Sequence, residues 1–314
     1  MLDSAGAQRR LGRVLVTGGM GFLGGALAKR LSRDGAETVI SDLGHGAAAP
    51  AGLRACDLAD RRQVDALLED QGIDTIIHAG AVSGPMVMAD LPLDIWRINV
   101  TGTAYLLEAA RSNRVGRFVL CSSVDVYGPN SSGMIDEEAA LAPECVYGAS
   151  KVAAEAAMTG YAREHGIDAV ALRFSWIYGP GRRTPTTLER LIRAGLAGEP
   201  VTLGDRASDR THYLFIDDAV AAVLAAAKSP AGLPRRTNNI TAGDGLPLER
   251  VVETLSGLLP QLRVSFGQRQ SPEAGPTGFD LTNAALDLGY RPQVPLSQGL
   301  HQYVESLKHE RATS

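Results

Sequence analysis

Short apolar runs rich in β-branched residues alternate with segments of helical apolar spacing through the first half of the chain. The runs have the length of strands, and apolar residues at i, i+3 and i+4 between them indicate amphipathic helices. Strands are predicted at residues 14–17, 38–42, 53–58, 74–81 and 118–121, and helices at 26–31, 61–70, 95–110 and 147–163. This alternation predicts an α/β fold built on a doubly wound parallel sheet.

Three glycines at every third position join the first predicted strand to the first predicted helix. Gly18 permits a sharp turn, Gly21 lets the backbone approach a ligand, and Gly24 lets the helix pack close to the strand. The free N–H groups that follow, at Phe22 and Leu23, would then face a pyrophosphate. A glycine-rich loop without a ligand is the alternative, since the spacing alone is a weak signal.

Asp42 ends the second predicted strand. A carboxylate at this position can accept both ribose hydroxyls of an adenosine and would repel a 2′-phosphate. No Arg or Lys follows at residues 43–46 to hold such a phosphate. The pattern therefore favours NAD over NADP, with a solvated turn carboxylate as the alternative.

Tyr147 and Lys151 lie one helical turn apart and therefore face the same way. A phenol is too weak a base at neutral pH, but a cation within a few ångströms favours the phenolate. Tyr147 could then exchange a proton with a substrate hydroxyl as hydride moves at the same carbon. Ser123, at a predicted strand end, could hold the substrate oxygen, and Lys151 would reach the nicotinamide ribose. Taken alone, such a pair is usually a surface pair.

Other predicted strand ends and helices add candidates for the cofactor site. Small residues after the strand at 74–81 leave room for a cofactor, and a buried Asn in a helix needs a hydrogen-bonding partner. His78, a single histidine at a strand end, is expected to pack or hydrogen-bond rather than catalyse. The small residues are Ala79 and Ala81, and the buried Asn is Asn99.

Composition excludes several classes of function. The 314 residues carry 31 basic and 35 acidic side chains without a basic cluster, which gives no indication of nucleic-acid binding. No apolar run reaches the ~20 residues of a membrane span, and the N-terminus lacks the apolar core of a signal peptide. Cys56, Cys121 and Cys145 form no CxxC pair, so we expect a cytoplasmic protein without a metal site.

These motifs, in this order, resemble the extended short-chain dehydrogenase/reductase family, the group of NAD-dependent sugar epimerases and dehydratases. The resemblance runs from residue 13 to about residue 307. It rests on residues 17–24, Asp42, Asp57 with Leu58, residues 99–103, Ser122 with Ser123, residues 126–128, residues 147–151, Arg173 with residues 178–181, and residues 216–220.

The resemblance implies a Rossmann-type NAD-binding part and a smaller part that holds substrate, commonly a nucleoside diphosphate sugar. We expect a flexible leader at 1–12, the NAD-binding domain mainly at 13–175, and the substrate-binding region mainly at 176–314, with interleaved segments. The implied cofactor contacts include Asp57, Leu58, Ala79, Ala81, Asn99 and Ser122. The implied substrate contacts are Ser83, Ser123, Trp176, Arg182, Arg183 and Arg210.

Three departures from the family pattern weaken the expectation of a nucleotide on the substrate. Trp176 stands where the family often has Asn. The arginine that the family has before the Asp-Asp turn lies one residue early, at Arg210. The family's late Arg-Pro-Gly-Asp segment is missing, and the most similar sequence begins at Arg269. Four arginines remain candidates for binding an anion: Arg182, Arg183, Arg210 and Arg269. The alternative is that they form a solvated surface.

Three functions stay open from the sequence. The first is a nucleotide-sugar epimerase that keeps NAD bound, and the second is an NAD dehydrogenase or reductase of a free sugar, sugar acid or other small polar alcohol. A non-enzymatic dinucleotide sensor is disfavoured because Tyr147 and Lys151 are both present. The helices at 95–110 and 147–163 carry apolar residues on more than one face, so we expect a homodimer that pairs them.

Overall fold

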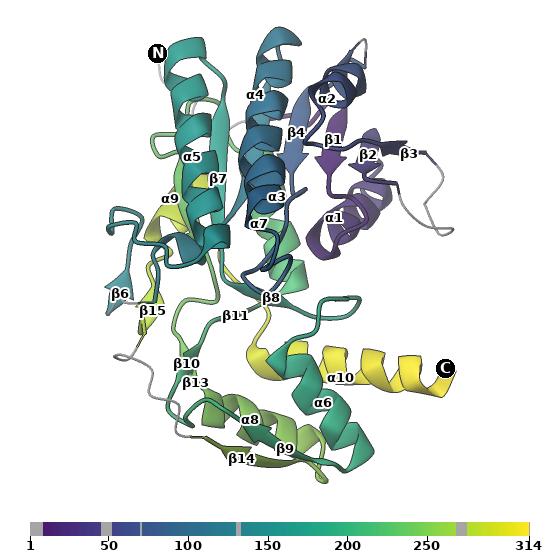
Figure 1. Ribbon diagram of the computed structural model, residues 1–314, viewed down its shortest axis with the longest axis vertical. Helices are drawn as coiled ribbons and strands as arrows, with labels where there is room; N and C mark the ends of the chain where they lie inside the picture. Colours follow the sequence, from purple (N-terminus) through teal and green to yellow (C-terminus); the bar gives the residue numbers. More distant parts are fainter. Residues whose placement is uncertain (1–8, 45–51, 70, 130–132, 268–274, 314) are drawn as a thin grey trace.

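A parallel sheet of seven strands forms the centre of the molecule (Figure 1). The computed structural model describes residues 9–44, 52–69, 71–129, 133–267 and 275–313. The strand order is β12-β7-β5-β4-β1-β2-β3, and the order reverses between β1 and β4, where α/β sheets bind ligands. The strands are β1 (Val14–Thr17), β2 (Thr38–Asp42), β3 (Leu53–Ala55), β4 (Thr75–His78), β5 (Arg117–Ser123), β7 (Ala169–Phe174) and β12 (Thr237–Ile240).

Helices cover both faces of this sheet, which confirms the predicted α/β architecture. Val14 and Val16 pack toward one face and Leu15 toward the other, so β1 is apolar at successive positions and fully buried. One face carries α1 (Phe22–Arg33) and α7 (Ile216–Lys228), and the other carries α2 (Arg61–Leu68), α4 (Gly102–Ser112) and α5 (Val146–His165).

The helix predicted at 95–110 is composed of three successive parts. It begins as α3 (Pro92–Trp96), widens into the π-helical turn η1 (Arg97–Thr101), and continues as α4. A π-turn inserts a residue into the helix, which interrupts the regular 3.6-residue spacing. The predicted strand at 53–58 is shorter than expected and ends at Ala55.

A smaller group of elements lies beyond the carboxyl ends of the strands, toward which the arrowheads in Figure 1 point. It contains α6 (Thr187–Ala197), α8 (Leu248–Leu258), α10 (Leu296–Thr313) and the pairs β8 (Trp176–Tyr178) with β11 (Tyr213–Phe215), β9 (Pro200–Leu203) with β14 (Arg263–Phe266), and β10 (Arg210–Thr211) with β13 (Leu246–Pro247). The remaining elements are η2 (Val124–Val126), β6 (Met134–Ile135), β15 (Gly278–Phe279) and α9 (Thr282–Leu288). β12 and α7 return from this half of the chain to the sheet.

The described part of the expected N-terminal leader is attached to the fold. The backbone N–H of Arg9 donates to the carbonyl of Lys228 at 2.9 Å, and its guanidinium pairs with Asp168 at 3.1 Å. Arg9 thus contacts residues far along the chain, and the flexible leader at 1–12 stays a prediction. Residues 1–8 lie outside the described residues.

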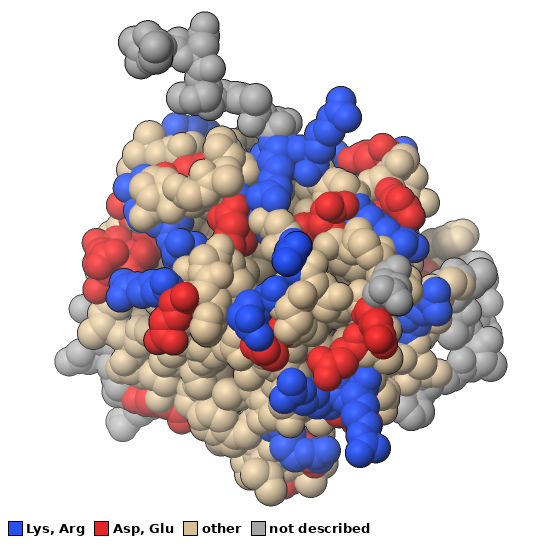
Figure 2. Space-filling view, turned by 90° about the horizontal axis from the view of Figure 1, so that it is seen from above, with Lys and Arg blue, Asp and Glu red and all other residues tan. Residues whose placement is uncertain are grey.

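Positive and negative side chains are interspersed over the face shown in Figure 2. No helix in the described ranges is long and apolar enough to cross a membrane. In those same ranges, no group of three or more His, Cys, Asp or Glu side chains is arranged to hold a metal ion.

Candidate active site

The glycine turn after β1 fits the roles expected of its first and third glycines. Gly18 has φ +68°, and a Cβ there would lie 2.6 Å from the Cα of Gly80. A Cβ on Gly24 would lie 2.1 Å from the carbonyl oxygen of Gly18. Any larger side chain would push the turn away from β4 or the helix away from the turn.

The start of α1 is an open anion-binding terminus. Gly21 is its N-cap, no side chain caps the first turn, and no acidic residue stands in that turn. The first N–H groups of a helix, which include those of Phe22 and Leu23, have no acceptor within the helix. These groups and the positive end of the helix dipole suit a pyrophosphate.

The carboxylate of Asp42 lies beside this turn, at the end of β2. One oxygen accepts the backbone N–H of Met20 at 2.9 Å, and the other accepts that of Leu43 at 2.8 Å. Each carboxylate oxygen keeps a further lone pair for a hydroxyl donor. The arrangement suits the two adenosine ribose hydroxyls that the sequence predicted as its partners.

Tyr147 and Lys151 are buried side by side on α5, at the carboxyl end of β5. The Lys151 Nζ donates to the carbonyl of Cys121 at 2.9 Å and lies 5.8 Å from the centre of the Tyr147 ring. Burial lowers the pKa of Lys151 to about 8. The ammonium therefore remains protonated at neutral pH.

The pKa of Tyr147 moves in the direction opposite to the one that the sequence suggested. Burial raises it, and the nearby carboxylate of Asp125 raises it further, while a hydrogen bond with Ser123 lowers it. The ammonium of Lys151 does not offset these effects, because it is directed at the Cys121 carbonyl. Without cofactor, Tyr147 is thus a protonated phenol that contacts Ser123.

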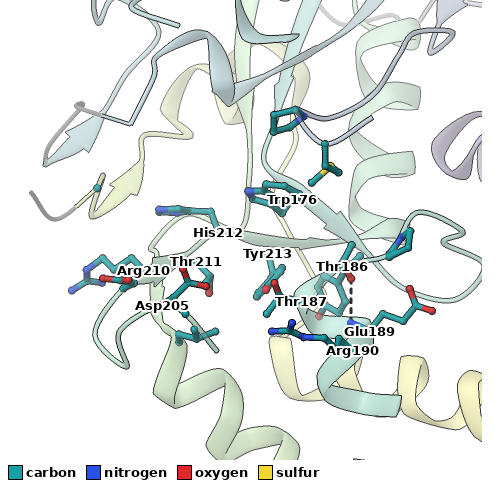
Figure 3. A pocket seen from close by; sticks show the side chains of 18 of the residues that line it. Trp176, Thr186, Thr187, Glu189, Arg190, Asp205, Arg210, Thr211, His212 and Tyr213 are labelled. Carbon is teal, nitrogen blue, oxygen red and sulfur yellow. Dashed lines mark hydrogen bonds between the residues drawn. The ribbon is translucent and has the colours of Figure 1, made fainter. Parts of the chain in front are cut away.

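A cavity of about 1850 Å³ opens next to this pair, between the sheet and the C-terminal elements. Asp125 and Cys145, which neighbour Ser123 and Tyr147 in the chain, line its inner end. Trp176 and Arg210, two of the expected substrate contacts, line the same cavity (Figure 3). Arg210 extends away from Tyr213 in this view, and its guanidinium donates to the Gly245 carbonyl.

Four of the expected substrate contacts do not line this cavity: Ser83, Ser123, Arg182 and Arg183. Ser83 and Arg183 are exposed. The guanidinium of Arg182 is turned toward α1 and lies 5.7 Å from the centre of the Phe22 ring. Its donation to the carbonyl of Ile177 holds it there. Arg269 lies outside the described residues.

The chain matches the model of the NAD dependent epimerase/dehydratase family over residues 14–241. The chain belongs to this family. It is 32% identical to the UDP-glucose 4-epimerase of Mycolicibacterium smegmatis, over 95% of this chain and 99% of that protein. It is 29% identical to the dTDP-glucose 4,6-dehydratase of Streptomyces niveus, over 96% of this chain and 94% of that protein.

Crystal structures of relatives have the same fold. The UDP-glucose 4-epimerase of Thermus thermophilus, in complex with NAD, superposes with a TM-score of 0.82 at 25% identity, over 94% of this chain and 99% of that one. The protein is therefore an NAD-dependent enzyme of the epimerase/dehydratase family, and its cofactor is NAD. The glycine turn, the uncapped start of α1 and the carboxylate of Asp42 fit that cofactor.

Two buried residues around the switch point of this epimerase/dehydratase fold are hydrogen-bonded, as expected. Asn99 accepts the N–H of Val82 at 2.8 Å and donates to the Ser150 hydroxyl at 2.9 Å, which ties η1 to α5. His78 lies between the hydroxyls of Thr17, at 2.8 Å, and Thr103, at 2.9 Å.

The partners of His78 define its tautomer. The Thr103 hydroxyl donates to the carbonyl of Asn99 at 2.6 Å, so it accepts from Nε2. The Nδ1 of His78 then accepts from Thr17, whose oxygen also accepts the N–H of Gly80. Burial lowers the pKa of His78 to about 3, which keeps the ring neutral. His78 therefore has a structural position between β1 and α4.

The other expected cofactor residues line the loops after β3 and β4. Leu58 is buried under Gly80, whose Cβ would lie 2.8 Å from the Leu58 Cδ1. Asp57 accepts the N–H of Ala59 at 2.9 Å within its own turn. Ala79 and Ala81 follow β4 and are half-buried.

The hydroxyl of Ser122, an expected cofactor contact, is hydrogen-bonded within the protein. Its hydroxyl donates to the Glu155 carboxylate at 2.5 Å, and Glu155 forms a buried ion pair with Arg173 at 2.7 Å. Arg173 also donates to the Tyr127 hydroxyl at 2.7 Å, and Tyr127 donates to Asn239 at 2.7 Å. The Ser122 hydroxyl thus belongs to a buried network that joins β5 to α5 and β7.

Several cavity residues were missed from the sequence. Asp125 lies inside a motif that had been singled out for its serines and Tyr127, and its proximity to Tyr147 depends on the fold. Arg190 extends from α6 toward the middle of the cavity, and Tyr213 and His212 line it from β11 and the residue before it (Figure 3). Arg190 stands at a polar position of an amphipathic helix, which is the only signal that the sequence offered.

Proposed function

We propose that the protein is a nucleotide-sugar epimerase that acts at a secondary hydroxyl and retains its NAD. The observation that carries this proposal is a cavity of about 1850 Å³ whose lining includes Asp125 and Cys145, both close to Tyr147. Pockets for ordinary small ligands measure about 300–1,000 Å³, so a free sugar would fill only part of it. A sugar at Tyr147 with a nucleotide toward α6 and α8 suits its size and the charged side chains in its lining, which include Arg190.

Each side chain has a separate role in the reaction at the substrate carbon. NAD, when bound, accepts and returns a hydride there. Tyr147 exchanges the hydroxyl proton with the substrate, and Ser123, which is close enough to lower the pKa of Tyr147, orients the same oxygen. Lys151 stays protonated below pH ~8 and supplies positive charge beside the phenol. The positive charge of an oxidised nicotinamide would further favour the phenolate that the apo site disfavours.

The test combines the purified protein with a set of UDP- and dTDP-hexoses. An epimerase yields an isomer of unchanged mass without net NADH, and the protein as purified shows excess ultraviolet absorbance from retained NAD. Tyr147→Phe is the matched control, because it removes only the hydroxyl. Net NADH formation with a free sugar or sugar acid would instead establish the dehydrogenase, and this proposal would be abandoned.

Asp125 supports a second candidate, a dehydratase. Removing a proton beside an oxidised carbon and expelling a hydroxide as water requires an acid/base in addition to the phenol. The carboxylate of Asp125 lines the cavity near Tyr147, and burial raises its pKa. A product that is lighter by one water would favour this reaction over epimerisation. Asp125→Asn should no longer form this product, whereas Glu144→Gln, a change at the same cavity, should still form it.

We further propose a cytoplasmic homodimer, in which residues 13–175 mainly bind NAD and residues 176–314 mainly bind substrate. Leu93 and Trp96 support the dimer, since their side chains are 71% and 38% exposed on α3, beside α4 and α5. The free Cys56, Cys121 and Cys145 support a reducing compartment. Light scattering at micromolar concentration tests the dimer, and a mass equal to one chain would rule it out.

A further inference from the structure

Trp176 presents a large apolar ring to the cavity assigned to the substrate (Figure 3). The side chain is 38% exposed, and among the residues that the structure describes its indole N–H has no acceptor. Several other side chains that line this cavity are charged, Arg190 and Asp205 among them. The ring therefore offers a flat apolar face and one free donor to a ligand in the cavity.

Trp176 lies close to the groups that carry the reaction. Strands β5 and β7 are paired in register, with Ser123 opposite Phe174. Trp176 follows Phe174 by two residues, and two residues of chain span at most about 7 Å. Ser123 in turn is close enough to Tyr147 to lower its pKa. A sugar whose hydroxyl reaches Tyr147 is therefore within reach of the indole ring.

The backbone holds the indole ring in a fixed place. The N–H of Trp176 donates to the carbonyl of His212 at 3.1 Å, and β8 pairs in parallel with β11, with Trp176 opposite Tyr213. At the other end of β8, Tyr178 is buried and packs edge to face against the ring of Phe215. The ring is thus positioned before a ligand binds, which lowers the entropic cost of using it as a contact.

We infer that the sugar ring of the substrate stacks on Trp176, and that this residue selects a substrate by its pyranose ring. The C–H groups on a face of such a ring match a flat apolar surface, and the hydroxyls at its rim can accept from the indole N–H. The inference rests on the proposed function and deepens it. Epimerisation requires the ring to turn over between the loss and the return of hydride, and an apolar contact permits this because it is non-directional.

The test uses the fact that the chain contains two tryptophans. Trp96 has the same exposed fraction, but it lies on α3 and is not part of the cavity lining. Trp96→Phe leaves Trp176 as the single indole, and Trp176→Phe leaves Trp96. Both changes are made in NAD-bound Tyr147→Phe protein, so that hydride transfer does not disturb the emission. Fluorescence is followed during titration with UDP-glucose, dTDP-glucose, and UDP and dTDP alone.

The emission of Trp176 should move to shorter wavelength when a sugar nucleotide binds, because a stacked sugar removes water from the indole. UDP or dTDP alone should shift it much less, and the emission of Trp96 should not change. In calorimetry, Trp176→Leu should bind UDP-glucose about 10-fold more weakly, since the apolar area of the ring is lost. Its affinity for UDP should stay the same, which shows that the variant is folded. Trp176→Phe keeps a flat ring and should recover most of the loss.

Three outcomes would overturn the inference. The first is an unchanged Trp176 emission at high concentrations of both sugar nucleotides, and the second is equal affinity of Trp176→Leu and Trp96→Leu for them. The third is a shift that UDP alone produces in full, which would assign the ring to the nucleotide. An isomeric product with an unchanged Trp176 emission would overturn only the stacking. A shift on sugar binding without an isomeric product from the wild type would overturn only the epimerase proposal.

Discussion

Replacing Lys151 by Met should make the cofactor-free protein more stable at neutral pH. The site buries an ammonium whose pKa falls from 10.5 to about 8. At ~1.4 kcal/mol per pKa unit, this difference lowers the stability of the folded protein by about 3 kcal/mol at any pH at which Lys151 is charged in the folded state. Loss of the hydrogen bond to Cys121 offsets about 1 kcal/mol of the gain. We therefore expect a net gain of about 2 kcal/mol at pH 7.

The stability difference between the wild type and Lys151→Met should depend on pH. Because the folded-state pKa of Lys151 lies below the unfolded value, the folded protein binds fewer protons between about pH 8 and 10.5. The wild type therefore regains stability relative to Lys151→Met as the pH rises through that window. Between pH 7 and 9.5 the gap should shrink by about 2 kcal/mol.

Urea unfolding at both pH values, after removal of NAD, measures the gap. Lys29→Met is the control, because Lys29 is exposed on α1 and its removal should leave the free energy of unfolding nearly unchanged at either pH. A gap that stays constant from pH 7 to 9.5, or a wild type more stable than Lys151→Met at pH 7, would refute the reasoning that burial of this ammonium is costly.

Three further predictions concern other parts of the site. Glu155→Gln should lower the free energy of unfolding in urea by about 3–5 kcal/mol, since it leaves buried Arg173 unpaired, and the double change to Met at both positions should lower it less. Asp42 should make NAD bind roughly tenfold or more tightly than NADP in calorimetric titrations, and equal affinities would contradict its role. Tyr147→Phe should lose about 10²–10⁴ in kcat while NAD binding persists, and Ser123→Ala should lose less; full activity of the Phe variant would place the acid/base elsewhere.

Local spacing was enough to predict much of the site. The turn at Gly18 and Gly24 and the pairing of Tyr147 with Lys151 follow from steric and helical rules that act within a few residues. Those features are found where the sequence placed them. The alternation of strands and helices likewise predicted the parallel sheet, because a strand buried on both faces must be continuously apolar.

Only the tertiary structure decided the electrostatics and the convergence of distant segments. The sequence suggested that Lys151 would lower the pKa of Tyr147, whereas burial and Asp125 raise it, and burial is a property of the packed whole. Arg182 and Arg183 are neighbours with the same chemistry in the sequence, and the fold turns one toward Phe22 and leaves the other exposed. Spacing along a chain determines which side chains share a face, but the packing of separate elements determines which of them lose water and which charges they meet.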